Sequence, residues 1–362
     1  MVLGFHYGWG FFQPEPGSFF AYALVPVRIL WIGVDLFFVL SGFLIIGLLL
    51  ATRFDPNYFL NFFARRINRI VPLYVVMLLL FWSGIALHHY AIVYLPRLFE
   101  AASGWGFYAI FLQNFHMARH GPDINFLSVS WSLAVEEQVY LVLPLLVYLA
   151  RNSIKALAAI FVFSIILAVA FRAGLAWAAP NHAEVANYVL PFARMDAFAA
   201  GGLIAIAYSC AWPGKRSHWL ALSWACAVIG AFGIAQLAVK NVFGQQKYLV
   251  IILFFIGVLM LALLQDQKSL LRRVLRGRIF NWLGSISYGL YLMHLPVLGL
   301  CMALYGLADV ELILEKPKAI TLLALTISLA LAHLSYQRFE KPIIVQSRLR
   351  FAYKELSQTI KS

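Results

Sequence analysis

Nine long apolar stretches constrain the fold of this chain more than any other feature. They cover residues 29–51, 70–88, 132–150, 156–176, 192–209, 218–238, 248–264, 281–304 and 319–337. Each is close to the roughly 20 residues that an α-helix needs to cross the hydrocarbon core of a bilayer. Because backbone amides in lipid find no water, a span of this length satisfies its hydrogen bonds as a helix. The sequence therefore predicts an all-α fold, a polytopic bundle of transmembrane helices.

A tenth span is expected to be present only in part. Residues 2–9 are apolar, but they are too few to cross a bilayer and lack the charged start of a signal peptide. We interpret them as the end of a first helix whose beginning is absent. Residues 105–115 are also apolar and short, which indicates a re-entrant or interfacial piece. About ten spans thus form one integral membrane domain, residues 1–340, which a basic tail, residues 341–362, follows.

Lys and Arg are unevenly distributed between the two sets of connections. Of the 28 Lys and Arg, 19 lie in one set, which comprises residues 52–69, 151–155, 211–217, 265–280 and 338–362. Basic loops stay on the cytoplasmic side, so this set and the C-terminus are expected there. The net charge of +13 follows from the same loops, and no nucleic-acid partner is predicted. Membrane lipid is the expected partner, and the oligomeric state stays open.

Several common kinds of site are excluded. The chain has no nucleophile elbow, Walker loop or dinucleotide fingerprint, which argues against a serine hydrolase, an ATP-driven pump and a nicotinamide enzyme. The three cysteines lie in or beside apolar runs and are interpreted as small hydrophobic residues. His116 and His120 are four residues apart, but the following Gly121-Pro122 argues against one helix there. No metal site is predicted.

Charged residues inside the apolar stretches are candidates for function. Asp35 lies near one end of an apolar run, where a carboxylate costs about 2.5–3.5 kcal/mol at the helix centre and therefore faces protein or a wet cavity. Arg194 and Asp196 are two residues apart, so they point to different faces of a helix and are expected to have other partners in the bundle. Each serves either a structural ion pair or the lining of a polar cavity.

Two arginines stand at the expected cytoplasmic mouth of a span. Arg66 and Arg69 are three residues apart and share one helical face. Their guanidinium groups suit the phosphates of a cytoplasmic cofactor, to which they donate bidentate hydrogen bonds. The alternative is topological, because orientation and anionic lipid also favour basic residues at this place.

Acid–base groups are found near the opposite ends of the helices. Glu136 and Glu137 lie about one turn inside a span, where Glu136 acts either as a base toward a hydroxyl or as the partner of a buried arginine such as Arg194. His6 and His294 lie near helix ends, where a lone histidine is more often a packing residue. His6 is nevertheless the best-placed general base, because imidazole titrates near neutral pH.

Six motifs, in order, resemble the acyltransferase-3 family of membrane O-acyltransferases. They are Trp31–Ile46, Arg65–Tyr74, Trp131–Tyr140, Arg194–Gly202, Leu283–His294 and Leu334–Pro342. The resemblance covers nearly the whole chain and implies an acyltransferase domain over residues 1–340. It also implies transfer of an acyl group, commonly acetyl, from cytoplasmic acyl-coenzyme A to a sugar hydroxyl of a glycan or glycolipid, without a metal. Lipopolysaccharide and peptidoglycan are among the bacterial acceptors, and the bacterial inner membrane is the expected location.

The resemblance also implies residue roles. His6 matches the catalytic histidine, Arg66 and Arg69 the paired arginines, and Glu136 the glutamate of a Trp-Ser-Leu-x-x-Glu element. The other intramembrane charges of the family are matched by Asp35, Arg194 and Asp196. The family arginine that precedes the histidine would lie before Met1. Either the true start lies upstream, or the chain is a truncated and inactive relative.

The resulting hypothesis is a mechanism with one polar chamber. Arg66 and Arg69 hold the coenzyme A phosphates, and Asp35, Tyr74 and Arg194 line the chamber that receives the pantetheine arm. His6 takes a proton, either from the acceptor hydroxyl or while it carries the acyl group itself, and Glu136 orients its imidazole. Two alternatives from other classes are a glycan or lipid-linked sugar transporter, which also needs buried charges, and a non-catalytic membrane scaffold.

Overall fold

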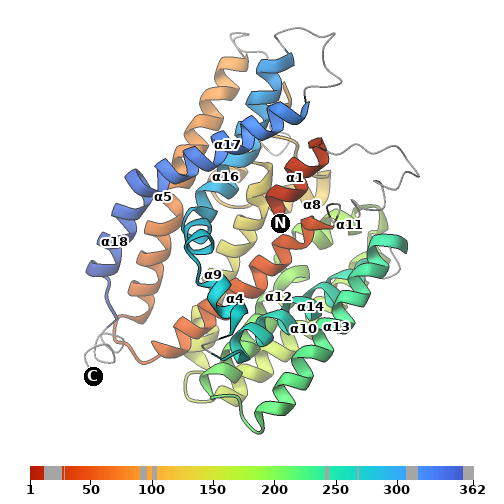
Figure 1. Cartoon of the computed structure of the whole chain (residues 1–362), viewed down its shortest axis with the longest axis vertical. Coiled ribbons are helices and arrows are strands. Elements are labelled where there is room, and N and C mark those ends of the chain that lie inside the picture. The colour runs from red at the N-terminus through yellow and green to blue at the C-terminus, as the bar shows by residue number, and fades with distance from the viewer. Residues whose placement is uncertain are drawn as a thin grey trace.

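The computed structural model describes residues 1–11, 27, 29–89, 96–99, 104–240, 244–266, 269–306 and 317–353. Within these residues every regular element is helical, and nine helices are long and apolar enough to cross a membrane. The predicted all-α polytopic bundle is confirmed (Figure 1).

The nine long elements follow the predicted stretches in order. They are α4 (Gly33–Ala51), α5 (Tyr58–His89), α9 (Trp131–Leu149), α10 (Ile154–Ala178), α12 (Pro191–Ser209), α13 (Arg216–Lys240), α14 (Lys247–Leu264), α16 (Arg278–Gly306) and α17 (Pro317–Ser335). The shorter helices are α1 (Val2–Phe11), α6 (Pro96–Phe99), α7 (Gly104–Ala109), α8 (Gln113–His120), α11 (Pro180–Val189), α15 (Leu270–Leu275) and α18 (Lys341–Arg350). Single turns are η1 (Leu30–Ile32), η2 (Ser128–Ser130), η3 (Gly244–Gln246) and the π-helical η4 (Tyr336–Glu340).

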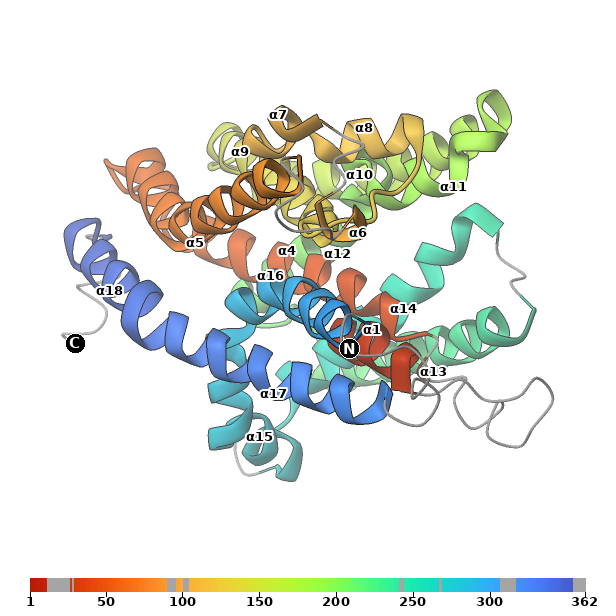
Figure 2. The same ribbon diagram turned by 90° about the horizontal axis from the view of Figure 1, so that it is seen from above.

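Helix α4 lies between two groups of helices. Figure 1 shows α10, α12, α13 and α14 on one side of it and α5, α16, α17 and α18 on the other. Packing contacts join α4 to α12, α14 and α9, and they join α16 to α17. The short helix α1 packs against α16 and α17, and it also contacts η1, which leads into α4 (Figure 2). The N-terminal residues are therefore held at the junction of the two groups.

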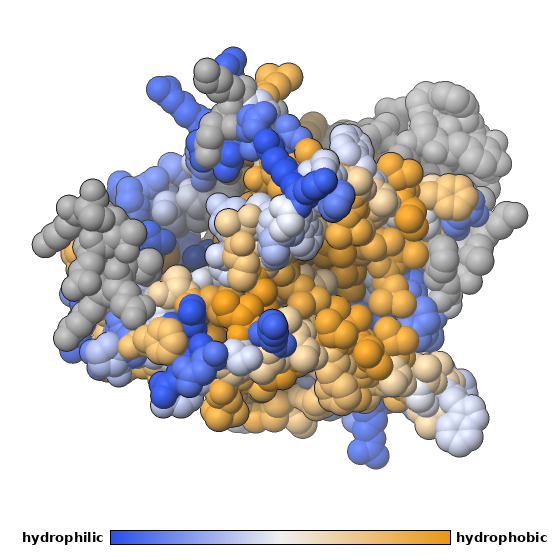
Figure 3. Space-filling view, turned by 90° about the horizontal axis from the view of Figure 1, so that it is seen from below, coloured by the Kyte–Doolittle hydropathy of each residue, from blue (hydrophilic) through white to orange (hydrophobic). Residues whose placement is uncertain are grey.

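Large apolar side chains cover much of the outer surface. Leu79 and Leu80 of α5, Phe163 and Ile166 of α10 and Phe232 of α13 are all exposed. Figure 3 shows apolar residues over much of one face, with hydrophilic residues toward its edges. In water such a surface would drive association, whereas lipid tails cover it without cost.

Two predicted boundaries differ from the structure. The predicted span 70–88 lies within a longer helix, α5, which begins at Tyr58, so Arg66 and Arg69 share a helical face as the sequence predicted. The expectation that His116 and His120 do not share a helix was wrong. Both belong to α8, and their rings stack with centroids 4.1 Å apart. Gly121, at a φ of +102°, ends α8 after His120 instead of interrupting it.

The backbones of α4 and α12 approach closely at two glycines. A Cβ atom on Gly42 would collide with the Phe198 carbonyl, whose carbon would lie 2.8 Å away. A Cβ atom on Gly201 would collide with the Val39 carbonyl in the same way. Small residues are typical of such contacts, because helices in lipid associate through close packing rather than through the hydrophobic effect. This contact places Asp35 of α4 beside Arg194 of α12.

Gly42→Ala is expected to lower the free energy of unfolding by about 1–3 kcal/mol, because the backbone atoms it meets cannot move aside independently. Gly47→Ala, on the same helix, is the matched control, since its Cβ would meet no atom within 4 Å. The control should be neutral or gain up to about 1 kcal/mol from helix propensity. Thermal unfolding of the detergent-solubilised protein measures both, and equal effects in the two variants would contradict the packing argument.

The first part of the predicted tail is docked on α5. Helix α17 continues through η4 into α18, which packs along α5. The guanidinium group of Arg65 donates to the carbonyl oxygens of Phe351 (2.7 Å) and Arg348 (3.2 Å), and it lies 4.5 Å from the ring centre of Tyr353. Arg65 is therefore occupied by the tail. Residues 354–362 lie outside the described residues.

Candidate active site

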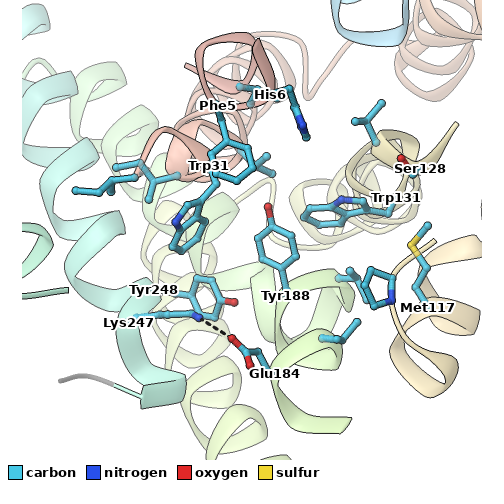
Figure 4. Close-up of a pocket in the computed structure, with 18 of the residues that line it drawn as sticks. Phe5, His6, Trp31, Met117, Ser128, Trp131, Glu184, Tyr188, Lys247 and Tyr248 are labelled. Carbon is cyan, nitrogen blue, oxygen red and sulfur yellow. Dashed lines mark ion pairs between the residues drawn. The ribbon is translucent and has the colours of Figure 1, made fainter. Parts of the chain in front are cut away.

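A cavity of about 670 Å³ lies where α1, η1, η2 and α11 meet. Its walls are mainly aromatic and aliphatic, and Phe5, Trp31, Trp131, Tyr188 and Tyr248 contribute the rings (Figure 4). Apolar pockets with a few polar groups are the usual form of sites for small molecules.

His6 supplies a titratable group to this cavity. The imidazole lies at one side, and the Tyr188 hydroxyl points toward the middle of the space (Figure 4). His6 lies in α1, outside the nine spans, and burial lowers the pKa of its imidazole from the usual 6.5. The neutral form, which accepts a proton, is therefore the main form near neutral pH.

Hydrogen bonds fix α1 against α16 and α17. The Tyr7 hydroxyl donates to the carbonyl oxygen of His294 (3.0 Å) and lies 2.8 Å from the Ser328 hydroxyl. The imidazole of His294 is completely buried, and its ring centre lies 5.2 Å from that of His6. The structure therefore brings together the two histidines that the sequence singled out, although they are far apart in the chain.

Lys247 places a positive charge on the cavity wall. Its Nζ atom lies 5.5 Å from the ring centre of Trp31 and 3.7 Å from a carboxylate oxygen of Glu184 (Figure 4). The side chain of Lys247 is 14% exposed and that of Glu184 is 77% exposed. The acidic partner is thus largely in solvent, and the ion pair is weak.

Two buried ion pairs lie behind the aromatic wall. Arg194 pairs with Asp35, and an Nη atom of Arg172 lies 2.6 Å from a carboxylate oxygen of Asp196. Arg194 and Asp196 therefore do not pair with each other, as their spacing predicted. The Arg194 guanidinium carbon lies 4.0 Å from the ring centre of Tyr248, a cation–π contact. Arg172, which comes from α10, was not among the predicted site residues, although a basic residue in an apolar stretch was a visible signal.

Three residues expected to line the chamber do not line this cavity. Asp35 and Arg194 are buried behind Tyr188 and Tyr248, because each satisfies the charge of the other. Tyr74 is also buried, where its hydroxyl donates to the Tyr108 carbonyl oxygen (2.9 Å). Their expected contact with a pantetheine arm has no counterpart at this cavity.

A separate polar cluster surrounds Glu136 of α9. Its carboxylate accepts a hydrogen bond from Ser41 (2.6 Å) and another from the Tyr140 hydroxyl. The Arg66 guanidinium carbon lies 5.2 Å from the ring centre of Tyr140, and Arg69 follows three residues later on the same helix. Among the described residues, the carboxylate of Glu136 therefore contacts neither His6 nor Arg194. Both expected partners are replaced by Ser41 and Tyr140, which sequence reasoning missed because neither is charged.

The two arginines of this cluster are available to a ligand. Within the described part of the chain, neither Arg66 nor Arg69 forms an ion pair or a side-chain hydrogen bond, and the Arg69 side chain is exposed. Arg65, by contrast, is held by the C-terminal segment. The two unpaired arginines of this helix can thus be distinguished from Arg65, which is bound by the tail.

Helix α9 joins the cluster to the cavity. Trp131 lines the cavity, and Glu136 follows five residues later, about 7.5 Å along the helix axis. Between them, Ser132 lies 2.5 Å from the hydroxyl of Tyr291, which lines the cavity and donates to the Val129 carbonyl oxygen (2.7 Å). In place of the single chamber that the sequence predicted, two sites lie along α9: the cavity that His6 lines and the polar cluster around Glu136.

Comparison with known proteins identifies similar chains. A family model described as an acyltransferase domain matches residues 1–336. The peptidoglycan O-acetyltransferase OatA of Listeria monocytogenes is 26% identical over 337 residues, which cover 86% of this chain and 51% of the relative. The putative peptidoglycan O-acetyltransferase YrhL of Bacillus subtilis is 27% identical over 352 residues, which cover 91% of this chain and 53% of the relative. The O-acetyltransferase OatA of Staphylococcus aureus is 25% identical over 347 residues, with 89% and 54% covered.

The chain spans about half the length of these curated relatives. No solved structure matches it.

Proposed function

Because the chain belongs to the acyltransferase-3 family of membrane O-acyltransferases, we propose that it is a membrane O-acetyltransferase that modifies a hydroxyl of a glycan. The observation that carries this proposal is the half-buried imidazole of His6 on the wall of an aromatic cavity, where burial lowers its pKa. A base in that state can take the proton of a hydroxyl at neutral pH.

His6 acts on the acceptor hydroxyl in this proposal. As the hydroxyl oxygen attacks the thioester carbon of acyl-coenzyme A, a C–O bond forms and the C–S bond breaks. The proton that His6 removes then passes to the departing thiolate. A variant of the route, in which the acyl group first moves to His6 and then to the acceptor, uses the same residues. In both routes the neutral imidazole is the active form.

The donor binds at the arginine cluster. Arg66 and Arg69 have guanidinium groups without a described ion-pair partner, and such groups bind phosphates through paired hydrogen bonds. Glu136, with Ser41 and Tyr140, supplies negative charge near the two arginines. It does not orient the imidazole of His6. In this proposal this end and the C-terminus lie in the cytoplasm of a bacterial cell, with the chain in the plasma membrane, which the basic connections of this end support.

The acceptor binds in the cavity at the opposite end. Flat rings such as those of Trp31, Trp131 and Tyr188 offer apolar faces against which a sugar ring can pack. The similar proteins are named peptidoglycan O-acetyltransferases, so a cell-envelope glycan such as peptidoglycan is the acceptor class that we propose.

Acetyl transfer by purified protein in lipid vesicles tests this proposal. Vesicles that contain the protein are given radiolabelled acetyl-coenzyme A on one side and soluble peptidoglycan fragments on the other, and base-labile acetyl esters on the fragments are measured. Ester formation that depends on both substrates is the expected result. Movement of unmodified glycan without ester formation would overturn the proposal in favour of a transporter.

Substitution of the arginines is expected to weaken donor binding. Arg66→Ala with Arg69→Ala should raise the KM for acetyl-coenzyme A by roughly tenfold to a hundredfold, because two charge-assisted contacts are lost at about 1.5–3 kcal/mol each before compensation by solvent. The KM for the acceptor should not change. Steady-state kinetics in vesicles measure both constants, and an unchanged KM for the donor would leave the arginines a purely topological role.

A further inference from the structure

The imidazole of His294 has one defined tautomer. Its Nδ1 atom lies 2.7 Å from the Tyr291 carbonyl oxygen, which can only accept a hydrogen bond. Nδ1 therefore carries a hydrogen. The Nε2 atom is completely buried and forms no hydrogen bond with any described residue. A second proton on it would create a buried cation without a counter-ion, so Nε2 presents a lone pair.

The His6 ring is the neighbour that this lone pair can serve. The two imidazole centres lie 5.2 Å apart with their planes inclined at 47°, close enough for edge nitrogen atoms to come within hydrogen-bond reach. The other neighbours of His6 include the ring of Phe5, which cannot form such a bond. Among the described residues of α16, the Nε2 atom of His294 is the only side-chain polar atom that is both buried and unpaired, and its ring lies beside that of His6.

The position of His294 is fixed from both sides. Tyr7, which follows His6 directly, donates to the carbonyl oxygen of His294 and contacts Ser328 of α17. Tyr291, one turn before His294 on α16, lines the cavity and holds the Nδ1 atom. The ring of His294 can orient the neighbouring imidazole, since its own rotation would break the hydrogen bond from Nδ1 to the Tyr291 carbonyl oxygen.

We propose that His294 is the positioning residue of His6: when the His6 ring turns an N–H toward it, the otherwise unpaired Nε2 atom accepts that N–H, and the other His6 nitrogen, with its lone pair, then faces the cavity. This inference rests on the proposed function, in which His6 takes the proton of the acceptor. It gives to a neutral histidine the orienting role that a carboxylate has in the triads of hydrolases, while Glu136 serves the arginines.

Other titratable groups near His6 remain in place in every variant considered below. Those on the cavity walls are Asp123, Glu184, Lys247, Tyr188, Tyr248 and Tyr291. A change of pH profile on substitution of His294 therefore reports the loss of its own lone pair. Since a lone pair stabilises the protonated form of His6 through a charge-assisted bond, its removal moves the acidic limb of kcat/KM to lower pH.

The first test compares His294→Phe, which keeps the ring shape, with His294→Gln, which keeps an acceptor. His294→Phe should lower kcat roughly tenfold to a hundredfold with an unchanged KM for the acceptor. His294→Gln should lower kcat less and should move the acidic limb of kcat/KM less far toward low pH. His333→Phe, on α17 beside Trp282, is the histidine control and should match the unaltered protein. Equal losses in His294→Phe and His294→Gln, without a shift of the acidic limb, would overturn the proposal.

The second test reads the tautomer of His6 without any activity measurement. In ¹⁵N-histidine-labelled protein in bilayers, the His6 signals are assigned by their loss in His6→Gln. One neutral tautomer is expected in the unaltered protein and a mixture in His294→Phe. The same tautomer populations in both would refute the positioning role. Absence of acetyl transfer by the unaltered protein would instead refute the proposed function, so the two failures are distinguishable.

Discussion

His6→Ala should lower kcat for acetyl transfer by about 10²- to 10⁴-fold, because the imidazole that takes the proton of the acceptor hydroxyl is then lost. The KM for acetyl-coenzyme A should change little, since the arginines that we propose for the donor lie in the other polar cluster. Radiolabelled acetyl transfer in vesicles measures both constants.

The pH dependence of kcat/KM reports the pKa of the His6 imidazole. Activity requires neutral His6, so it is present above the pKa of the imidazole and is lost as pH falls through it. Burial lowers this pKa, so the acidic limb of kcat/KM should have its midpoint below 6.5. The limb should be absent from the residual activity of His6→Ala.

A matched control separates this effect from general damage. His182→Ala changes an exposed histidine of α11 and should leave the rate and the acidic limb unaltered. If His6→Ala were as active as this control, the assignment of His6 as the base would be wrong, and another residue would have to act as the catalytic base.

Asp35→Ala should lower the free energy of unfolding by about 3–5 kcal/mol, the typical result of removing one partner of a buried ion pair. Arg194 would then remain without its carboxylate, and its side chain is only 1% exposed to water. Thermal and denaturant unfolding of the protein in detergent measure the loss.

A double variant tests whether the loss comes from the pair. In Asp35→Leu with Arg194→Met no charge remains to be desolvated, so most of the stability should return. Asp266→Ala breaks the surface pair with Arg216, whose side chains are 56% and 79% exposed, and should cost at most about 1 kcal/mol. A double variant as unstable as Asp35→Ala would show that the two residues do not act as a pair.

The spans could be predicted because their signal is local. A stretch such as residues 156–176 reveals a helix by length and hydropathy alone, and α10 (Ile154–Ala178) extends it by only two residues at each end. The predicted span 70–88 misses the first part of α5 for the same reason. The first twelve residues of α5 contain three arginines, and packing against α18, not hydropathy, makes them helical.

The partners of the buried charges could not be predicted in this way. Asp35 and Arg194 are 159 residues apart, and Ser41 and Glu136 are 95 apart, so neither contact leaves a trace in any local pattern. The spacing of Arg194 and Asp196 indicated other partners for both, but it could not name Asp35 or Arg172. The expected contact of Glu136 with the imidazole of His6 is absent from the described residues. Glu136 lies more than one helical turn along α9 from Trp131 of the cavity, and its carboxylate binds Ser41 and Tyr140 instead.

By itself, the sequence determined that this chain crosses a membrane many times as helices, that its charges avoid lipid, and which residues resemble those of acyltransferases. These properties depend on composition and on neighbours along one helix. Only the tertiary structure decided that Arg65 binds the tail while Arg66 and Arg69 stay unpaired, and that His294, rather than Glu136, lies beside His6. Such choices depend on the close approach of α4 to α12 and of α1 to α16, where the packing of whole helices sets which side chains meet.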